Sequence, residues 1–330
     1  MKIFNYEHRY DRVQLEIFGI KVSYRKKLKT LIHNPVSIVI DTTLLCNNNC
    51  YFCWRKNKPE YLKKISKKYK KSMTMPFSTY KKIIDDIAKY DCARILSLCG
   101  PMGEPMMNKN IVKFYSYAYK TGHFNELTAN TNGLALDKHN IKELLNSLTE
   151  LSISVDSINP DTYEKIHGNG ETLPTVINNI KKCIEIKKKY NCKAKIVCRF
   201  TENDLNKGEF PEFKEFFKNL GVDSINYTHV HAFAGIMEDM ISKETAKDCC
   251  HIDKTINFNF LGDMTTCCIN WQLSPTFGNI ENNTIEQMWN NEAMQKWKKE
   301  RLQTIPCSQC SGLGEHIQKS NLDSEVSYEN

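Results

Sequence analysis

The sequence predicts an α/β fold, a partial (β/α)6 TIM-like barrel followed by a small C-terminal domain that contains a β-hairpin. From residue 36 onward, apolar, β-branched runs of strand length alternate with longer segments of helical period. After residue 240 this rhythm stops and paired cysteines appear. With 330 residues, 41% of them hydrophobic, the chain can bury the core of a large domain and a small one.

The barrel prediction depends on six strands separated by helices. The expected strands are residues 36–41, 93–99, 125–130, 150–155, 193–200 and 222–228. The expected helices lie near residues 77–90, 108–121, 138–147, 160–166, 173–190 and 210–219. Such alternation fits a parallel sheet curled into an incomplete barrel, whose ligands bind at the carboxyl ends of the strands.

Two terminal regions flank this pattern. Val13–Phe18 and Ile20–Tyr24 alternate apolar and polar residues around Gly19, which predicts a small accessory hairpin. The tail from Ser320 onward is expected to be disordered. We therefore divide the chain into an accessory hairpin, the barrel, the C-terminal domain and a disordered tail, at residues 1–35, 36–235, 236–315 and 316–330.

Composition limits the cellular setting. No run of eighteen apolar residues occurs, and Met1–Arg9 carries charges where a signal peptide would be apolar. We therefore expect a cytoplasmic location and no membrane partner. The 14 cysteines then indicate metal or redox chemistry rather than disulfides, because the cytosol keeps thiols reduced.

The net charge of +8 raises the question of nucleic-acid binding. Much of the excess lies in residues 56–71, which contain eight lysines. This run lacks the arginines and regularly spaced aromatic residues that base stacking would use. We interpret it as a solvated lysine-rich loop and keep RNA binding only as the weaker alternative.

Three cysteines directly after the first barrel strand carry the main chemical signal. Cys46, Cys50 and Cys53 have C-x3-C-x2-C spacing. Three thiolates can hold a [4Fe–4S] cluster, which normally takes four, and leave one iron open. A structural zinc site is the alternative, but no His or further Cys follows within twenty residues of Cys53 to complete it. Unrelated core thiols are a third interpretation, which the interleaved asparagines disfavour.

This segment resembles the cluster-binding loop of the radical S-adenosylmethionine (SAM) superfamily, C-x3-C-x-Φ-C, with Phe52 at the aromatic position. The resemblance implies that Cys46, Cys50 and Cys53 bind the cluster and that its open iron chelates SAM. It further implies reductive cleavage of SAM to a 5′-deoxyadenosyl radical, which needs an electron donor such as flavodoxin or ferredoxin. The cofactor then supplies the hard chemistry, and the protein supplies position and exclusion of solvent.

Two later strand ends also resemble this family. Gly100–Pro105 is similar to the G-G-E-P motif, with Met102 where the first glycine usually stands, and the resemblance implies that Gly103 and Glu104 contact the amino group of SAM. The T-N-G strand end is matched around Asn132. Without the cysteine loop, both segments would be interpreted as ordinary turns.

Polar residues on the fourth and fifth strands extend the expected SAM site. Alternation places Ser152, Ser154 and Asp156 on one side of the fourth strand, and the resemblance assigns Ser154 to the ribose with Asp156 nearby. Arg199, near the end of the fifth strand, could clamp the cofactor carboxylate or form a surface ion pair. We interpret His229 and His231 as pocket-lining or hydrogen-bonded histidines rather than metal ligands.

The C-terminal domain carries a second set of cysteines. Cys249-Cys250, Cys267-Cys268 and the pair Cys307 and Cys310 provide four ligands, and a hairpin around Gly262-Asp263 would bring the first two pairs together. A zinc ribbon is the alternative. The spacing resembles the SPASM/twitch extension of radical enzymes, which implies one auxiliary [4Fe–4S] cluster on Cys250, Cys267, Cys307 and Cys310. Cys249 or Cys268 could replace its neighbour.

The expected function is a radical SAM oxidoreductase with a dehydrogenase-like reaction. It would abstract hydrogen from an alcohol-bearing small molecule, such as a sugar or aminocyclitol, and oxidise it through the auxiliary cluster. A peptide maturase is disfavoured because 35 residues before the first strand are too few for a leader-binding module. An epimerase, with Cys198 or Cys268 as hydrogen donor, and a zinc-stabilised nucleic-acid-binding module are further alternatives. The scattered cysteines are expected to be buried thiols, namely Cys92, Cys99, Cys183, Cys192 and Cys198.

Overall fold

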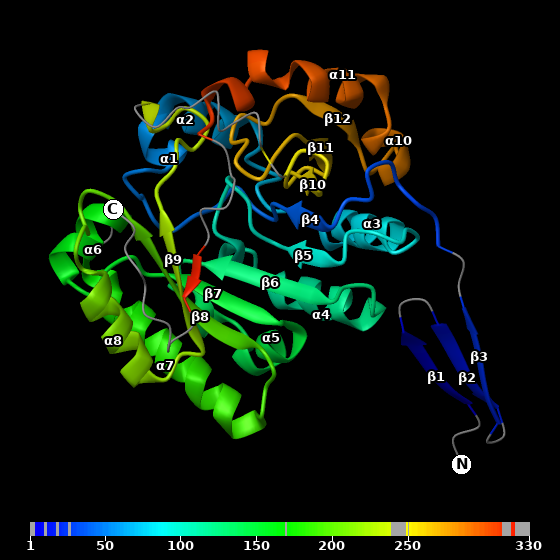
Figure 1. Ribbon diagram of the computed structural model, residues 1–330, viewed down its shortest axis with the longest axis horizontal. Coiled ribbons are helices and arrows are strands. Elements are labelled where there is room, and N and C mark those ends of the chain that lie inside the picture. The colour runs from blue at the N-terminus through cyan, green and yellow to red at the C-terminus, as the bar shows by residue number, and fades with distance from the viewer. Residues whose placement is uncertain are drawn as a thin grey trace.

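The computed structural model describes residues 4–9, 12–17, 20–25, 28–168, 170–238, 249, 251–311 and 318–320 (Figure 1). Its main element is a ten-stranded sheet of order β12-β11-β10-β4-β5-β6-β7-β8-β9-β13. The strands from β4 to β9 follow one another in sequence order and pair in parallel. Among the described strands the sheet does not close on itself, so the predicted partial parallel barrel is confirmed.

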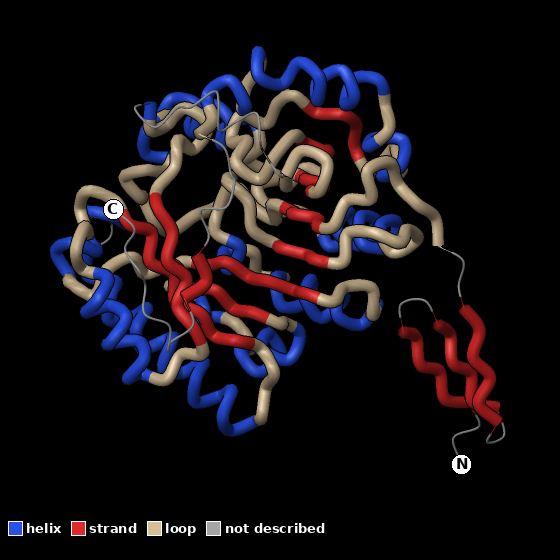
Figure 2. Tube along the Cα trace, viewed as in Figure 1, coloured by secondary structure: helices blue, strands red, loops and turns tan. Residues whose placement is uncertain are grey.

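The six barrel strands lie close to the predicted positions. They are β4 (Ser37–Ile40), β5 (Ile95–Ser97), β6 (Glu126–Thr131), β7 (Glu150–Ser154), β8 (Lys195–Glu202) and β9 (Ser224–His229). The helices that follow them are α3 (Phe77–Ile87), α4 (Ile111–Thr121), α5 (Ile141–Ser147), α6 (Pro160–His167), α7 (Leu173–Tyr190) and α8 (Phe210–Leu220). Figure 2 shows these helices outside the strands.

Local signals explain where α6 begins and ends. The Asn159 side chain accepts hydrogen bonds from the backbone N–H groups of Asp161 and Thr162, and Pro160 occupies the first turn. Gly168 ends the helix in the left-handed conformation, with φ of 68°. These limits matter because the last turn of α6 lies against the cysteine loop described below.

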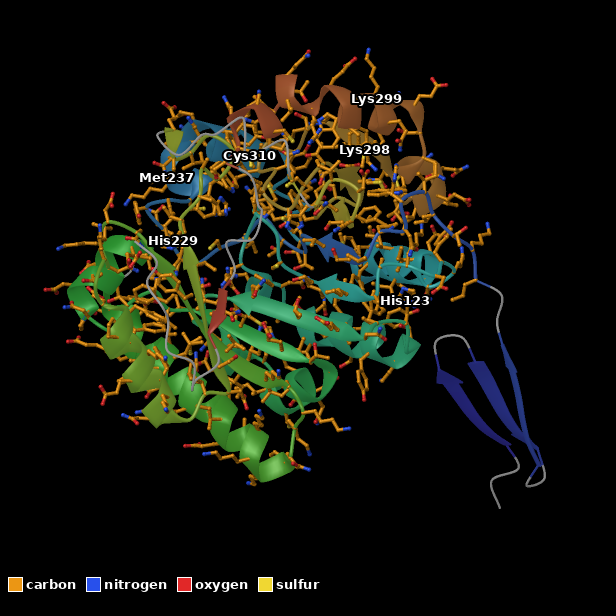
Figure 3. The ribbon with its side chains drawn as sticks, in the orientation of Figure 1. His123, His229, Met237, Lys298, Lys299 and Cys310 are labelled. Carbon is orange, nitrogen blue, oxygen red and sulfur yellow. The ribbon has the colours of Figure 1, made fainter. Side chains whose placement is uncertain are left out.

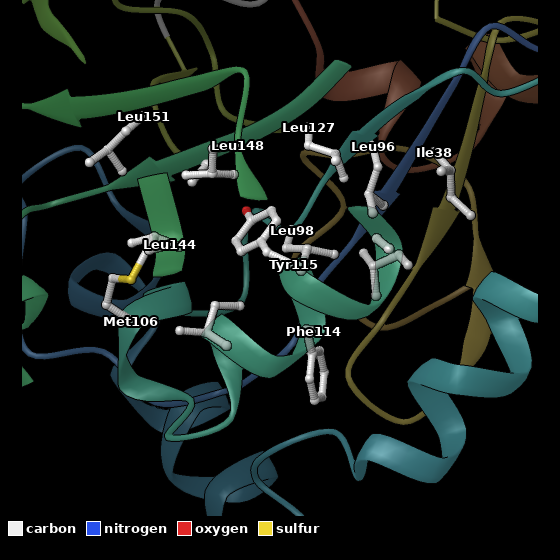
Figure 4. Packing of buried hydrophobic residues seen from close by; sticks show 14 of the residues in the cluster. Ile38, Leu96, Leu98, Met106, Phe114, Tyr115, Leu127, Leu144, Leu148 and Leu151 are labelled. Carbon is white, nitrogen blue, oxygen red and sulfur yellow. The ribbon is translucent and has the colours of Figure 1, made fainter. Parts of the chain in front are cut away.

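The core lies between the strands and the helices. One face of the strands is apolar and packs on α4, as Figure 4 shows for Leu96, Leu98 and Leu127 above Phe114 and Tyr115. All five side chains are at least 98% buried. Burying side chains of this size stabilises the fold by about 1.5–3 kcal/mol each. The apolar face of the sheet is therefore the one covered by the helices, and the opposite face is left open.

The C-terminal domain continues the barrel sheet. β10 (Thr255–Phe258) pairs in parallel with β4, and β11 (Asp263–Thr265) and β12 (Thr276–Asn279) follow in antiparallel order. The predicted hairpin around Gly262-Asp263 is therefore present. Two helices complete the domain, α10 (Ile285–Trp289) and α11 (Glu292–Glu300). The expected domain boundary near residue 235 is thus not a break in the sheet.

The terminal regions contain more strands than expected. Residues before the barrel form a three-stranded antiparallel sheet, β1 (Phe4–Arg9), β2 (Arg12–Ile17) and β3 (Ile20–Arg25), where we expected a two-stranded hairpin. Within the tail that we expected to be disordered, β13 (Gln318–Ser320) pairs antiparallel with β9. The other residues from 321 onward lie outside the described residues.

The lysine-rich run is helical, so its prediction as a loop is wrong. It forms α1 (Trp54–Asn57) and α2 (Pro59–Lys68). Tyr61, Leu62 and Ile65 pack on an apolar cluster with Trp54, and the lysines alternate with them at helical spacing. Within the described residues, no helix is long and apolar enough to cross a membrane.

Candidate iron–sulfur and S-adenosylmethionine site

Residues 46–53, here called the cluster loop, follow β4 at its carboxyl end. Cys46, Cys50 and Cys53 are free thiols, each half-buried. Burial raises the pKa of Cys46 to about 11 and the pKa of Cys50 well above its usual range, and the other two thiols add to the shift at Cys50. The three sulfurs are therefore close enough to interact electrostatically.

The cluster loop is fixed on α6. The backbone N–H of Asn49 donates to the carbonyl of His167 at 3.0 Å, and that of Tyr51 donates to the carbonyl of Ile166 at 2.9 Å. A Cβ added at Gly168 would lie 2.6 Å from the Asn49 carbonyl oxygen. Only glycine therefore allows the helix end and the loop to approach this closely.

His167 joins the cluster loop to the end of β7 and was missed in the sequence. Its Nδ1 lies 3.4 Å from Cys50 Sγ, and its Nε2 lies 3.1 Å from the Val155 carbonyl oxygen and 3.3 Å from Asp156 Oδ2. The ring is 2% exposed. No local motif marks this residue, because only the packing of α6 brings it to Cys50.

The Asp156 carboxylate has partners within the protein, and its expected place near the ribose stays a prediction. β7 ends at Ser154, and Asp156 adopts a left-handed conformation with φ of 61°. Its Oδ1 accepts the Thr201 N–H at 2.7 Å, and its carbonyl accepts the Asn206 side-chain amide. The turn therefore aims the buried carboxylate at His167 and β8.

The loop that resembles G-G-E-P packs directly on the chain before Cys46. A Cβ at Gly103 would lie 2.5 Å from the carbonyl oxygens of both Thr43 and Leu45. The Glu104 N–H donates to the Leu45 carbonyl at 2.8 Å. Gly103 therefore lets the two loops lie side by side, and its expected contact with the amino group of SAM stays a prediction.

The Glu104 carboxylate is occupied within the protein. It accepts hydrogen bonds from the Met106 N–H at 3.0 Å, the Thr131 hydroxyl at 2.5 Å and the Asn132 N–H at 2.8 Å. Burial raises its pKa, and these hydrogen bonds oppose the shift. The side chain thus ties this loop to the end of β6, and its expected contact with the amino group of SAM stays a prediction.

Asn132 reaches the cluster loop from the end of β6. Its side-chain amide donates to Asn47 Oδ1 at 2.8 Å. Beside it, the Asn48 side chain is buried and neither of its polar atoms has a hydrogen-bond partner. Buried amides normally have partners, so this part of the loop is suited to receive a polar ligand.

Asp41 is a further buried acid that the sequence did not single out. Its Oδ1 accepts the Met102 N–H at 3.2 Å, and a Cβ at Gly100 would overlap the carboxylate at 2.1 Å. Burial raises the pKa of Asp41 to about 8, and the Met102 hydrogen bond lowers it in part. Asp41 therefore fixes the position of the Gly100–Glu104 loop through its hydrogen bond with the Met102 N–H.

The open face of the barrel strands is polar, in contrast to the helix-packed face. We call this surface the lumen face; it includes Ser97, Cys99, Thr128, Asn130, Ser152, Ser154, Arg199 and Asn226. Ser154 lies opposite Arg199 in the β7–β8 register. Arg199 Nε is buried without a hydrogen-bond partner. The two residues expected to bind the ribose and the carboxylate are therefore neighbours.

Four of the five scattered cysteines are buried, as expected, and Cys99 is not. Cys92, Cys183, Cys192 and Cys198 are at most 4% exposed within the apolar core. Cys198 therefore lies on the helix-packed face of β8, which removes it as a hydrogen donor. Cys99 is half-buried on the lumen face, where strand alternation places it two residues after Ser97.

The second cysteine set lines a small cavity. Among the described residues, the thiols that line it are Cys249, Cys267, Cys307 and Cys310. We call this space the thiol cavity. Burial raises the pKa of Cys307 to about 12, and the other three thiols add to the shift. Cys250 lies outside the described residues, and Cys268 does not line the cavity. Among the described residues, Cys249 is the member of its pair that lines the cavity, and the choice between Cys249 and Cys250 stays open.

An aromatic contact connects the two cysteine regions. The Trp54 ring, next to Cys53, stacks on the Trp271 ring with centroids 5.8 Å apart and planes 10° from parallel. Trp54 Nε1 donates to the Pro101 carbonyl, and Trp271 Nε1 donates to the Ala234 carbonyl. Cys53, Cys267, Cys268 and Cys310 all pack on this apolar cluster. Both cysteine regions therefore pack on the same cluster of aromatic and apolar side chains.

Other aromatic and histidine residues surround the cluster loop. Phe52 stacks on Phe233 with a centroid separation of 5.3 Å, and His231 lies against the same Phe233 ring. His229 is exposed, pairs with Glu202 at 3.4 Å and lines a surface pocket with Met237 at the ends of β8 and β9 (Figure 3). The histidines thus line a pocket or contact aromatic rings, as interpreted.

The residues present fit two iron–sulfur clusters. Three free thiols with unpaired polar atoms nearby suit an open cluster, and four thiols around an apolar cavity suit a closed one. In the described part of the chain, no three His, Cys, Asp or Glu side chains converge tightly enough to hold a single metal ion. The fit therefore depends on ligand chemistry and on the cavity.

Comparison with known proteins agrees with this assignment. The radical SAM superfamily model matches residues 40–226, and the iron–sulfur cluster-binding domain named SPASM matches residues 249–311. A probable GTP 3′,8-cyclase of Methanocaldococcus jannaschii is 25% identical over 56% of both chains. The GTP 3′,8-cyclase of Clostridium perfringens is 31% identical over 52% of this chain and 48% of its own. The chain thus spans about half the length of these relatives.

Solved structures share the fold at low identity. BtrN in complex with AdoMet and 2-DOIA has a TM-score of 0.55 and 15% identity, covering 86% of this chain and 98% of BtrN. Streptococcus suis SuiB bound to precursor peptide SuiA has a TM-score of 0.58 and 13% identity, covering 85% and 70%. The family binds SAM at a [4Fe–4S] cluster, and the second domain binds an auxiliary iron–sulfur cluster. With its model matched over more than half of the sequence, this chain belongs to the radical SAM superfamily.

Proposed function

We propose that this protein abstracts a hydrogen atom from an alcohol-bearing small molecule and oxidises it, passing the remaining electron to the auxiliary cluster. The observation that carries the proposal is the polar lumen face beside the cluster loop. Barrel interiors are usually filled by apolar branched side chains. Here most apolar side chains pack under the helices, and the open face carries hydroxyl and amide groups together with Cys99, Arg199 and the two valines Val39 and Val197.

The protein residues would divide the work of binding the cofactor. Cys46, Cys50 and Cys53 would hold the cluster, and Gly103 would let the backbone approach the amino group of SAM. Arg199 would bind the carboxylate and Ser154 the ribose, because they are neighbours across β7 and β8. When bound, the cluster and SAM supply a 5′-deoxyadenosyl radical. An external one-electron donor such as flavodoxin or ferredoxin would reduce the cluster.

The lumen face supports a hydroxylated substrate over an apolar one. Ser152, Asn130 and Thr128 offer donors and acceptors without net charge, which match hydroxyl groups in both directions. The names of relatives and neighbours include a nucleotide, the ligand 2-DOIA and a peptide, so the superfamily fold alone does not select the substrate. The polar face is the feature of this chain that favours a sugar or aminocyclitol.

The thiol cavity supports an oxidation. Four thiols complete a [4Fe–4S] cluster, which leaves no iron open for a ligand. Alcohol oxidation removes one hydrogen atom from carbon, one proton from oxygen and one electron, and a closed cluster next to the barrel can accept that electron. Cys249, Cys267, Cys307 and Cys310 would thus hold an electron acceptor.

A second candidate is inversion of a C–H centre without net oxidation. The specific observation in its favour is Cys99, a half-buried thiol on the lumen face. A thiol in that place could return a hydrogen atom to a carbon radical. The two candidates share the first step and differ only in what happens to the radical.

The substrate class can be tested by stimulation of cofactor cleavage. Reduced holoenzyme with SAM would be incubated with sugars, aminocyclitols, GTP and short peptides, and 5′-deoxyadenosine would be measured by chromatography. We expect a sugar or aminocyclitol to raise its formation above the substrate-free rate and to yield a product lacking two hydrogen atoms. Stimulation by peptides alone would contradict the proposal. A product of unchanged mass would favour inversion.

A further inference from the structure

Cys99 differs from the other scattered cysteines in the face on which it lies. It directly precedes the Gly100–Glu104 loop and continues the alternation of β5, on the same side as Ser97. Leu96 and Leu98, which alternate with these residues, are completely buried under α4. The thiol therefore points toward the open face of the barrel.

Two polar neighbours hold the sulfur in place. Cys99 Sγ lies 3.0 Å from Ser97 Oγ and accepts a hydrogen bond from Asn130 Nδ2 at 3.1 Å. The Asn130 amide nitrogen can only donate, so the sulfur acts as an acceptor there. The contacts come from two adjacent strands, β5 and β6. They restrict the rotation of the side chain and keep the sulfur on the lumen face.

An independent observation points to a polar ligand on the same face, two strands away from this thiol. Ser152 is the β7 partner of Asn130 in the β6–β7 register. It is 1% exposed, and its hydroxyl oxygen has no hydrogen-bond partner. Leaving a buried hydroxyl without a hydrogen-bond partner is unfavourable. The lumen face therefore holds an unsatisfied polar group one strand away from the residue that binds Cys99.

Charged groups around Cys99 place it close to the expected SAM site. Burial raises the pKa of Cys99, the hydrogen bonds from Ser97 and Asn130 and the Arg199 guanidinium lower it, and the Asp41 carboxyl raises it. The sulfur therefore keeps its proton at neutral pH. Arg199 and the Gly100–Glu104 loop are the expected contacts of SAM; Cys99 directly precedes that loop, and Ser152 lies on β7, between the strands of Asn130 and Arg199.

The chemistry of a thiol in this position is specific. The S–H bond is weaker than the C–H bonds of an alcohol or of a methyl group, so a carbon-centred radical beside a thiol takes its hydrogen. We propose that Cys99 is a hydrogen-atom donor to carbon radicals formed at the lumen face. This inference depends on the first step of the proposed function, radical formation from SAM, but not on the identity of the substrate.

The step balances with one external electron. The radical carbon gains a hydrogen atom from Cys99 and forms a C–H bond, while the S–H bond breaks and leaves a thiyl radical. The thiyl radical then takes one electron from the low-potential reductant and one proton from solvent, which restores the thiol. When the radical carbon belongs to substrate and hydrogen returns to the opposite face, the result is inversion rather than oxidation.

The test uses SAM itself as the probe, because the substrate is not needed. Holoenzyme is reduced with dithionite in D2O, where the thiol exchanges its hydrogen for deuterium, and SAM is added alone. We expect the 5′-deoxyadenosine formed to carry one solvent deuterium, measured by mass spectrometry. We expect the labelled fraction to fall to the level of an H2O control in Cys99→Ser. The measured quantity is the fraction of 5′-deoxyadenosine molecules that carry deuterium. This fraction does not depend on how much 5′-deoxyadenosine is formed.

Matched controls separate the possible failures. Cys198→Ser and Cys268→Ser remove thiols off the lumen face and should retain the label. Unlabelled 5′-deoxyadenosine from wild-type protein, or equal labelling in Cys99→Ser, would overturn the role of Cys99 and leave the proposed function intact. Absence of any 5′-deoxyadenosine would instead contradict the proposed function. If Cys99→Ser does not load iron, loss of label in Cys268→Ser or Cys198→Ser would overturn the inference.

Discussion

The cluster loop and the thiol cavity both present reduced cysteines, but they differ in number and surroundings. The loop offers three half-buried thiols next to an unpaired asparagine and the polar lumen face. The cavity offers four thiols with apolar neighbours such as Ile252 and Ile269. A cluster with three protein ligands keeps an iron open for a ligand, and one with four does not. Ligand count and surroundings thus separate cofactor cleavage from electron transfer.

The largest expected effect comes from removing the loop ligands. Cys46→Ala/Cys50→Ala/Cys53→Ala should abolish SAM cleavage and reduce the iron content from about eight to about four atoms per chain, because only the auxiliary [4Fe–4S] cluster remains. Iron and sulfide analysis and 5′-deoxyadenosine formation measure both. Cys92→Ala, a buried thiol outside both sites, is the control. Residual SAM cleavage in the triple variant would contradict the assignment of SAM cleavage to the cluster loop.

Removing a cavity ligand should give the reverse pattern. Cys307→Ser is expected to lose the auxiliary cluster, about half of the iron, while SAM cleavage continues, since the cluster loop is intact. Product formation should fall because the electron acceptor is missing. Iron analysis and the ratio of product to 5′-deoxyadenosine measure these effects. Equal loss of both activities would mean that the two sites do not have separate roles.

The aromatic contact between the two regions should matter for stability. Trp271→Ala removes a ring that is 7% exposed and stacks on Trp54, so we expect a loss of about 3–5 kcal/mol in the free energy of unfolding. Denaturant unfolding of the anaerobic holoenzyme measures it. Trp271→Phe retains a ring and should lose less. No difference between the two variants would show that the stack is unimportant.

A smaller effect is expected where the loops approach each other. Gly103→Ala places a Cβ 2.5 Å from two backbone carbonyl oxygens, which cannot move independently. We expect a loss of about 1–3 kcal/mol in stability and weaker SAM binding, measured by calorimetry. Gly208→Ala is the control for SAM binding only, because its Cβ meets nothing within 4 Å but its φ of +87° strains any side chain and lowers stability by itself. Unchanged SAM binding in Gly103→Ala would contradict the close approach.

The dependence of stability on pH tests the burial of Asp41. Because burial raises the pKa of Asp41 to about 8, the folded protein binds this proton more tightly than the unfolded chain. Asp41 should therefore make the free energy of unfolding fall as pH rises from about 4 to 8, by at most about 1.4 kcal/mol per pH unit. Asp41→Asn should flatten this dependence in denaturant titrations. An unchanged slope would contradict the burial of the charge.

The barrel and the cluster loop were predictable because their signals are local. Six apolar runs separated by helical segments give the strand order directly, and the spacing of Cys46, Cys50 and Cys53 is read from eight consecutive residues. The lysine-rich run was misjudged because its charges obscured the helical spacing of Tyr61, Leu62 and Ile65. The spacing of the apolar residues, rather than the amino-acid composition, predicts the secondary structure of such a segment.

The remaining site residues depend on tertiary packing and could not be predicted. His167 reaches Cys50 across 117 positions of sequence, and β10 joins the barrel by pairing with β4. Asp156 continues the alternation of Ser152 and Ser154 in sequence, but a left-handed turn redirects it. Cys99 has no motif, and only the sheet shows which face it occupies. Sequence patterns thus give the elements, while the faces and long-range contacts need coordinates.

The most direct test of two distinct clusters is electron paramagnetic resonance of the reduced protein with and without SAM. The account predicts that SAM changes the spectrum of the wild type, because the cluster loop leaves one iron open. In Cys46→Ala/Cys50→Ala/Cys53→Ala the remaining signal should be the same with and without SAM. A SAM-dependent change in that variant, or no second signal at all, would contradict a closed auxiliary cluster in the thiol cavity.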